Sequence, residues 1–132
     1  MTAGRLDGRA ALITGAGSGI GLATAKRLAA DGARVLTTDR AGDVDIVADV
    51  TEPGINAKLV AEAEARLGGL DIVVACAGIT GMQPLDGHDD AFFDTMMAVN
   101  VTAVFRLMRD ALRLLKRSPH GRIILIGSVM SS

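Results

Sequence analysis

The stretch Thr14-Gly15-Ala16-Gly17-Ser18-Gly19-Ile20-Gly21 joins a short apolar run, residues 10–13, to a segment with helical periodicity. Apolar residues recur at helical spacing after the glycines, at Leu22, Ala25, Leu28 and Ala29. A strand that passes through glycines into a helix start predicts a phosphate-binding loop, because glycine permits a tight turn and the close approach of a ligand. The free N–H groups and the dipole at the start of the helix then favour a negative charge.

The composition of the 132-residue chain suits one compact domain with a large core, since 49% of residues are hydrophobic and 22% are charged. The net charge of −1 gives no electrostatic reason to expect nucleic acid or an anionic membrane as a partner. No apolar run approaches the roughly 20 residues that span a bilayer, and residues 1–9 lack the apolar core of a secretory signal. The single cysteine, Cys76, cannot form an internal disulfide or a zinc site by itself. We therefore expect a cytoplasmic protein without a metal.

The order of apolar and helical segments predicts an α/β fold. Strands are expected at 9–14, 34–39, 46–50, 70–76 and 121–127, and helices at 19–31, 53–67 and 90–117. The strand segments are continuously apolar rather than alternating, which is typical of strands buried on both faces, so a parallel sheet flanked by helices is favoured. The connection 40–45 is too short for a crossover helix. The third strand should therefore be short and lie at an edge.

The expected helix 90–117 is apolar around an unusually wide arc. At about 100° per residue, one side is shared by Phe93, Met97, Val101, Val104, Met108, Leu112 and Leu115. That side is extended by Met96, Ala103, Leu107 and Leu114. A narrow polar ridge, which we expect to be solvated, is formed by Arg106, Arg109, Arg113 and Lys116. A helix with one buried face needs only about a third of its circumference apolar. The excess predicts a second packing surface, covered either by a partner subunit in a homo-oligomer or by residues absent from this chain.

The spacing of the glycines distinguishes between nucleotide-binding families. The general dinucleotide fingerprint G-x-G-x-x-G fails from every starting glycine, and no Gly-Lys-Ser/Thr follows to make a Walker loop. The pattern Thr14-Gly15-x-x-x-Gly19-x-Gly21 resembles instead the short-chain dehydrogenase/reductase family. The resemblance covers the whole chain but only the N-terminal half of such an enzyme. It implies a Rossmann-like doubly wound parallel sheet, truncated after the fifth strand, and an incomplete NAD-binding domain over residues 1–132.

The resemblance also implies how the cofactor is held. Main-chain amides of the loop bind the diphosphate, and the residues assigned to this contact are Gly15, Ser18, Gly19, Ile20 and Gly21. Asp39, at the end of the second strand, can accept hydrogen bonds from both hydroxyls of the adenosine ribose and repels a 2′-phosphate. The loop carries Ser18 and no Lys or Arg, so NAD is expected rather than NADP, although Arg40 partly offsets this preference.

Two further segments resemble cofactor contacts of the family. Asp49-Val50 resembles the pair that contacts the adenine ring. A compatible alternative is a turn aspartate before Thr51-Glu52-Pro53, which would open the next helix with an N-cap residue and an early proline.

Ala75-Cys76-Ala77-Gly78 stands where the family usually has Asn-Asn-Ala-Gly. Cys76, Ala77 and Gly78 are small enough to let the cofactor ribose approach, but the asparagine that braces the central strands is replaced by Ala75. We expect Cys76 to be a small buried thiol.

The candidate catalytic residues are Asn100 and Ser128. Asn100 interrupts the apolar arc of the long helix, and a buried amide without a partner costs roughly 1–3 kcal/mol, so it must bond to backbone or water. Its position resembles the family's catalytic asparagine, which holds a water in a proton relay. The alternative is a structural amide bonded to a neighbouring carbonyl. Ser128 resembles the serine that binds the substrate oxygen. His88 and His120 lie in polar, loop-like surroundings and are expected to be solvated.

The resemblance implies an enzyme that interconverts a small secondary alcohol and a ketone. In the family a tyrosine, followed by a lysine, exchanges the proton with the substrate oxygen, and this chain contains no tyrosine. A placed general acid–base is worth about 10²–10⁴ in rate, so the chain by itself is expected to be inactive. A non-catalytic dinucleotide-binding module, or a vestigial fragment, is the alternative. Without further strands, residues 123–126 should form an exposed apolar sheet edge.

Overall fold

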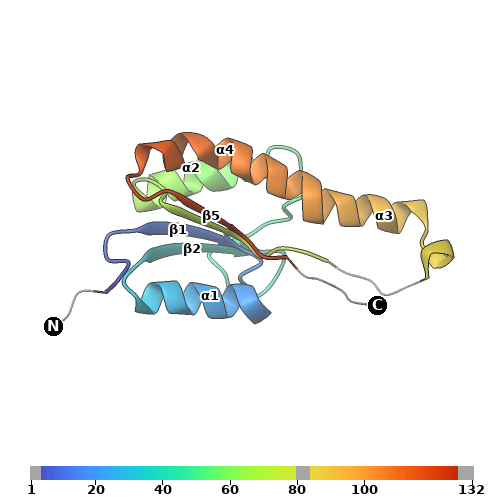
Figure 1. The fold of residues 1–132 in the computed structure, drawn as a ribbon, viewed down its shortest axis with the longest axis horizontal. Coiled ribbons are helices and arrows are strands. Elements are labelled where there is room, and N and C mark those ends of the chain that lie inside the picture. The colour runs from blue at the N-terminus through green and yellow to red at the C-terminus, as the bar shows by residue number, and fades with distance from the viewer. Residues whose placement is uncertain (1–3, 80–83, 128–132) are drawn as a thin grey trace.

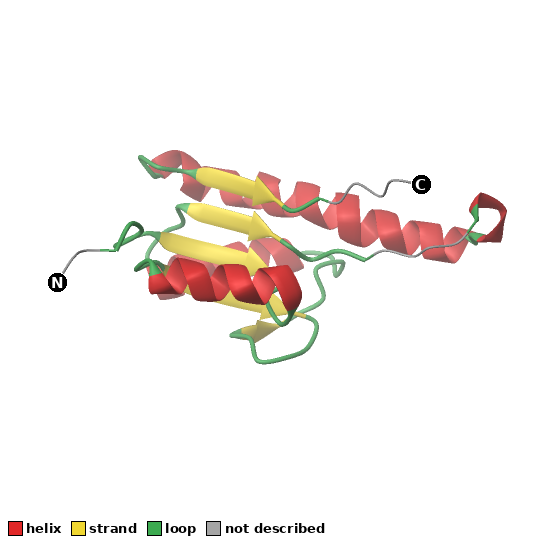
Figure 2. Cartoon of the chain, turned by 60° about the horizontal axis from the view of Figure 1, so that its bottom comes forward, coloured by secondary structure: helices red, strands yellow, loops and turns green. Residues whose placement is uncertain are grey.

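The sheet is parallel and lies between two layers of helices (Figures 1 and 2). The computed structural model describes residues 4–79 and 84–127. The strands are β1 (Ala10–Thr14), β2 (Arg34–Asp39), β3 (Ile46–Val47), β4 (Ile72–Ala75) and β5 (Arg122–Leu125), in the spatial order β3-β2-β1-β4-β5. Helix α1 (Gly19–Ala30) covers one face, and α2 (Ile55–Leu67) and α4 (Ala103–Arg117) cover the other. The predicted Rossmann-like parallel sheet is confirmed, with five strands among the described residues.

The continuously apolar strands are buried on both faces, as predicted. All residues of β1 and β4 are buried. Their side chains alternate between two clusters, so that Leu12 and Val73 pack with α2 and α4, whereas Ile13 and Val74 pack on the α1 side. By contrast, every residue of β5 is exposed. The expected apolar edge is therefore present.

The link between β2 and α2 differs in detail from the prediction. The third strand lies at the edge but ends at Val47, because the chain turns at Asp49, whose carboxylate accepts from the N–H and the hydroxyl of Thr51. The hydroxyl of Thr51 is thereby used in the turn and does not cap the helix. Helix α2 begins at Ile55 rather than at Pro53, after Gly54 in a left-handed conformation.

The amino ends of three strands are joined through Asp71, which precedes β4. Its carboxylate accepts from the N–H of Ala10, at 2.8 Å, and from the hydroxyl of Ser118. Its main chain donates to the carbonyl of Ala10 and accepts from the N–H of Arg122. Ala10 and Arg122 begin β1 and β5, so this single residue fixes how the central strand and the edge strand meet β4.

The long helix runs from Asp90 to Arg117 but contains a π-helical segment. It consists of α3 (Asp90–Met97), the π-helical η2 (Ala98–Thr102) and α4. The predicted wide apolar arc is confirmed, and in the structure it divides into a buried side and an exposed side. The buried side of α4 is Ala103, Leu107, Ala111, Leu114 and Leu115. The outer side, which we name the exposed stripe, consists of Phe93, Met97, Val101, Phe105 and Leu112.

The predicted polar ridge is only partly solvated. Arg113 pairs with Glu64 of α2, at 3.4 Å, and Arg117 reaches the same carboxylate. Arg109 lies over the ring of Phe105, 5.6 Å from its centroid, and pairs with Asp110. Arg113 and Arg117 therefore link α4 to α2, whereas Arg109 covers part of the exposed stripe.

By length and hydropathy alone, Asp90–Arg117 would also pass for a helix that crosses a membrane, since its best window has a mean hydropathy of 1.3. Core helices of soluble proteins pass the same test. Here α4 contributes Leu107, Ala111 and Leu114 to the main hydrophobic cluster.

Candidate functional site

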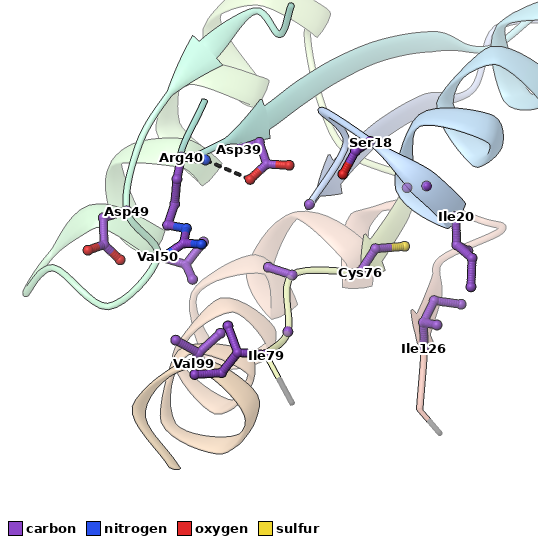
Figure 3. A pocket seen from close by; sticks show the side chains of 15 residues that line it. Ser18, Ile20, Asp39, Arg40, Asp49, Val50, Cys76, Ile79, Val99 and Ile126 are labelled. Carbon is purple, nitrogen blue, oxygen red and sulfur yellow. Dashed lines mark hydrogen bonds between the residues drawn. The ribbon is translucent and has the colours of Figure 1, made fainter. Parts of the chain in front are cut away.

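A pocket of about 360 Å³ opens at the carboxyl ends of the parallel strands (Figure 3). Its walls come from the glycine loop before α1, the end of β2, the turn after β3 and the segment after β4. Every residue predicted to contact the cofactor lines this pocket: Gly15, Ser18, Gly19, Ile20, Gly21, Asp39, Asp49, Val50, Cys76, Ala77 and Gly78. Sequence reasoning did not select Ile79, Val99 or Ile126, which line it too. In the sequence, each of the three lies within two positions of a residue that was predicted to belong to the site.

The glycine loop is packed tightly against the end of β4. Gly15 has a φ of +65°, and a Cβ added to it would lie 2.5 Å from the main-chain nitrogen of Ala77. Only glycine fits there. Ser18 is the N-cap residue of α1, and its side chain makes no capping hydrogen bond. Since the first N–H groups of a helix have no intrahelical partner, the start of α1 presents free donors to the pocket.

The carboxylate of Asp39 is held by two main-chain N–H groups. One oxygen accepts from Gly17 at 2.9 Å, and the other accepts from Arg40 at 2.7 Å, the bond drawn in Figure 3. A carboxylate offers about four acceptor sites, so both oxygens keep capacity for a ligand. Gly17 lies inside the quoted glycine stretch, but its role in positioning Asp39 could not be read from spacing.

The turn after β3 forms the far wall of the pocket. Thr51 donates to Asp49 from its hydroxyl at 2.7 Å and from its N–H at 2.9 Å. These hydrogen bonds, together with the nearby charge of Arg40, lower the pKa of Asp49. The interpretation of Asp49 as a turn aspartate is thus confirmed. It does not conflict with a ligand contact, since Asp49 and the buried Val50 both line the pocket.

Cys76 lines the pocket and is half-buried rather than fully buried as expected. Burial raises the pKa of its thiol, so the neutral form is favoured. The following residue, Ala77, donates its N–H to the hydroxyl of Thr14 at 3.4 Å, which connects the segment to β1. Within residues 4–79 and 84–127, no group of three or more His, Cys, Asp or Glu residues could hold a metal ion.

Asn100 lies in η2 and is exposed, not buried as expected, as is the adjacent Val101 of the exposed stripe. Its side chain forms a two-way clamp with the main chain of Ile79. The N–H of Ile79 donates to Oδ1 at 2.9 Å, and Nδ2 donates to the carbonyl of Ile79 at 2.8 Å. The prediction that this amide bonds to backbone is confirmed. The clamp fixes the segment after β4 to the long helix.

A second cavity of about 590 Å³ adjoins the pocket, since Ile20, Ala77, Gly78, Ile79 and Ile126 line both. Its remaining lining is mostly apolar and includes Met96, Val104, Leu125 and one polar residue, Asn100. The two spaces form one crevice that is polar at the Asp39 end and apolar at the other. Ser128 lies outside the described residues, two positions after Ile126.

The two histidines differ from each other. His88 was expected to be solvated, but it is half-buried and its ring stacks on Phe92, with centroids 5.3 Å apart and an interplanar angle of 22°. His88 has an extended backbone and precedes the N-cap residue of α3, so helical spacing could not have predicted this stack. His120 is exposed, as expected.

Comparison with known proteins assigns the chain to one family. The model of the short chain dehydrogenase family matches residues 9–132. The 3-oxoacyl-acyl-carrier-protein reductase of Escherichia coli is 34% identical over 139 residues, a match that covers 96% of this chain and 57% of the relative.

Two solved structures are also similar. A Burkholderia cenocepacia short chain dehydrogenase in complex with NADP is 36% identical with a TM-score of 0.85, covering 94% of this chain and 57% of that one. A Mycobacterium paratuberculosis short chain dehydrogenase bound to NAD is 32% identical with a TM-score of 0.88, covering 95% and 57%. The chain thus spans about half the length of the proteins it matches.

Proposed function

Because the chain belongs to the short-chain dehydrogenase/reductase family, we propose that it is the cofactor-binding part of an NAD-dependent oxidoreductase that interconverts a secondary alcohol and a ketone. The observation that carries the proposal is the crevice itself. The donors at the start of α1, the carboxylate of Asp39 and the small residues after β4 all face one space. The matched Escherichia coli enzyme is named for reduction of a 3-oxoacyl group, which supports ketone chemistry.

The pocket fits a dinucleotide. A Cβ added at Gly19 would meet no atom within 4 Å, although the φ of +55° there favours glycine. The loop therefore leaves room in front of the helix N-terminus, where a diphosphate would be stabilised. A nicotinamide dinucleotide, when bound, supplies hydride transfer.

The residues of this chain bind and orient the ligands. The N–H groups at residues 19–21 donate to the diphosphate. Asp39 accepts from the ribose hydroxyls, and Asp49 and Val50 border the adenine. Asn100 is a positioning residue that keeps Ile79 and the segment before it against the crevice. Ser128 donates a hydrogen bond to the substrate oxygen, which would lie in the apolar cavity.

The preference for NAD over NADP rests on Asp39 and Ser18. A carboxylate fixed at the ribose end disfavours a 2′-phosphate by charge repulsion. The solved structures do not decide the matter, since one is in complex with NADP and the other is bound to NAD.

The proposal is tested by calorimetric titration of the chain with NAD⁺ and NADP⁺. We expect NAD⁺ to bind more tightly. Asp39→Ala should weaken NAD⁺ binding by about 10- to 100-fold, the value of hydrogen bonds to a charged group, and should relax discrimination against NADP⁺. Asp43→Asn is the matched control, because Asp43 is an exposed carboxylate that does not line the pocket. Failure of the chain to bind either dinucleotide would refute the proposal.

A non-catalytic dinucleotide-binding module is the second candidate, since the residues proposed to bind the dinucleotide line one pocket of this chain. We propose that this chain by itself does not turn over. In a longer protein that supplies a tyrosine and a lysine, Ser128→Ala should leave NAD⁺ affinity intact while turnover falls. Equal turnover would remove Ser128 from the mechanism.

We further propose a cytoplasmic homo-oligomer with a small-molecule substrate, and neither nucleic acid nor membrane as a partner. The exposed stripe supports a second copy as the cover of the long helix. Phe93 and Phe105 of the exposed stripe are each more than half exposed. A continuous row of exposed large apolar side chains on one helix is typical of subunit interfaces.

A further inference from the structure

Asn56 of α2 is a buried amide with only half of its hydrogen bonds made. Its side chain is 2% exposed, and Nδ2 donates to the carbonyl of Val50 at 3.1 Å. Since a carbonyl can only accept, this bond settles which end of the amide faces Val50. Oδ1 is then a buried acceptor that has no hydrogen-bond partner among the described residues. Native proteins rarely leave such an acceptor without a partner, so a polar group is required beside it.

The cavity that Asn56 lines contains one further polar side chain, the buried Thr14 at the end of β1. The hydroxyl of Thr14 accepts from the N–H of Ala77 at 3.4 Å, and within the described part of the chain it donates to no acceptor. A hydroxyl has one hydrogen to donate. The other residues that line the cavity are apolar. The cavity therefore combines an acceptor that lacks a donor with a donor that lacks an acceptor.

The size of this cavity determines what can lie between the two groups. Its volume is about 10 Å³, the lower end of the roughly 10–15 Å³ that one water needs. We propose that the cavity is a hydration site, in which a single water donates to Oδ1 of Asn56 and accepts from the hydroxyl of Thr14. A buried water needs at least two polar partners, and these two side chains supply them. The water connects α2 to the end of β1.

The hydration site lies directly behind the nucleotide pocket, and its role there rests on the proposed function. Val50, Ala77 and Val99 line both the small cavity and the pocket of Figure 3, so they form the wall between the two. Asn56 holds the main chain of Val50, and Thr14 holds that of Ala77. A water between Asn56 and Thr14 joins both supports of the wall. Asn56 is therefore a positioning residue for the adenine side of the pocket.

The water is detected by nuclear Overhauser effects between water and the methyl groups of Val99 and Leu107, which line the cavity. We expect cross-peaks with the sign of a long-lived bound water. The hydroxyl of Thr14 exchanges its hydrogen with solvent and can give similar cross-peaks, so Asn56→Leu is the deciding variant. It removes Oδ1 and keeps the hydroxyl, and the cross-peaks should disappear. Their absence from the wild-type chain, or their persistence in Asn56→Leu, overturns the hydration site.

The positioning role is tested by calorimetric titration with ADP-ribose, the part of NAD that lacks the nicotinamide nucleoside. Asn56→Leu should weaken binding by about 2- to 10-fold, the value of one ordinary hydrogen bond, because Val50 loses its support. Ser118→Ala is the control, since it removes a hydrogen bond at the amino ends of the strands, away from the pocket, and its affinity should be unchanged. Thr14→Val should lose the water and part of the affinity, whereas Thr14→Ser keeps the hydroxyl and should retain both.

The outcomes separate this inference from the proposed function. Cross-peaks in a chain that does not bind ADP-ribose would support the hydration site and overturn the proposed function, and missing cross-peaks with intact binding would do the reverse. If Asn56→Leu loses the cross-peaks but binds as tightly as the wild type, the positioning role is refuted. Should Asn56→Leu fail to fold by circular dichroism, Ala75→Asn replaces it, because its longer side chain occupies the same cavity. The cross-peaks of Val99 and Leu107 must then disappear in that variant.

Discussion

Removal of the Asp71 carboxylate should destabilise the fold without affecting nucleotide binding. In Asp71→Ala, the N–H of Ala10 loses its acceptor, and Ala10 is only 1% exposed. An unsatisfied buried donor costs about 1–3 kcal/mol. The hydroxyl of Ser118 also loses a partner, but it is partly exposed and can turn to water, which adds about 0.5–1 kcal/mol. The expected loss is therefore about 3 kcal/mol in the free energy of unfolding, or a fall of about 10 °C in Tm.

Urea denaturation followed by circular dichroism measures this loss, and two companion variants divide it between the partners. Ser118→Ala removes only the weaker contact and should cost about 1 kcal/mol. Asp71→Asn keeps an acceptor for Ala10 and should also cost much less than Asp71→Ala. The affinity for ADP-ribose, measured where each variant is folded, should not change, because Asp71 precedes β4 whereas the pocket residues follow it. A loss below 0.5 kcal/mol for Asp71→Ala, roughly the scatter for neutral surface substitutions, would refute the reasoning.

Three further predictions concern the pocket, the helix and the core. Cys76 should react slowly with iodoacetamide at pH 7, because burial disfavours the thiolate, and its reaction should become faster only above pH 9.0, the ordinary pKa of a thiol. Bound ADP-ribose should protect Cys76 from labelling. Equal labelling with and without the nucleotide would place the ligand elsewhere. Phe105→Glu should reduce the mass measured by light scattering to that of a monomer, whereas Lys116→Glu on the exposed side of α4 should not. Ala75 shares a small cavity with Asn56, whose buried Oδ1 has no hydrogen-bond partner among the described residues. Ala75→Asn should therefore raise the free energy of unfolding by about 1 kcal/mol. A fall in the midpoint of chemical denaturation would show that the new amide does not fit.

The sequence allowed prediction of the sheet and the pocket because their signals are local. Buried parallel strands show as continuous apolar runs, and the glycine loop must combine a positive φ at Gly15 with close approach to Ala77. These requirements leave few alternatives for residue type. The short third strand was predicted from the length of one connection, because residues 40–45 leave no room for a helix between the second and third strands.

The features that prediction missed depend on contacts between distant segments. Residues 98–102 are weak helix formers apart from Ala98, since they comprise Asn100 and three β-branched residues, but weak propensity by itself does not mark a π turn. The turn is accompanied by the clamp between Asn100 and Ile79, which are 21 positions apart. The two-donor support of Asp39 was missed for the same reason, because Gly17 lies 22 positions away.

The clamp between Asn100 and Ile79 has a consequence for how binding depends on protein concentration. Asn100 belongs to the same continuous helix as the exposed stripe, so ordering of that helix by a second copy would also restrain the wall of the crevice. Two equilibria that share a rigid element are thermodynamically linked, and the linkage is reciprocal. Dilution that separates the copies should then weaken nucleotide affinity, and saturating nucleotide should strengthen self-association by the same factor.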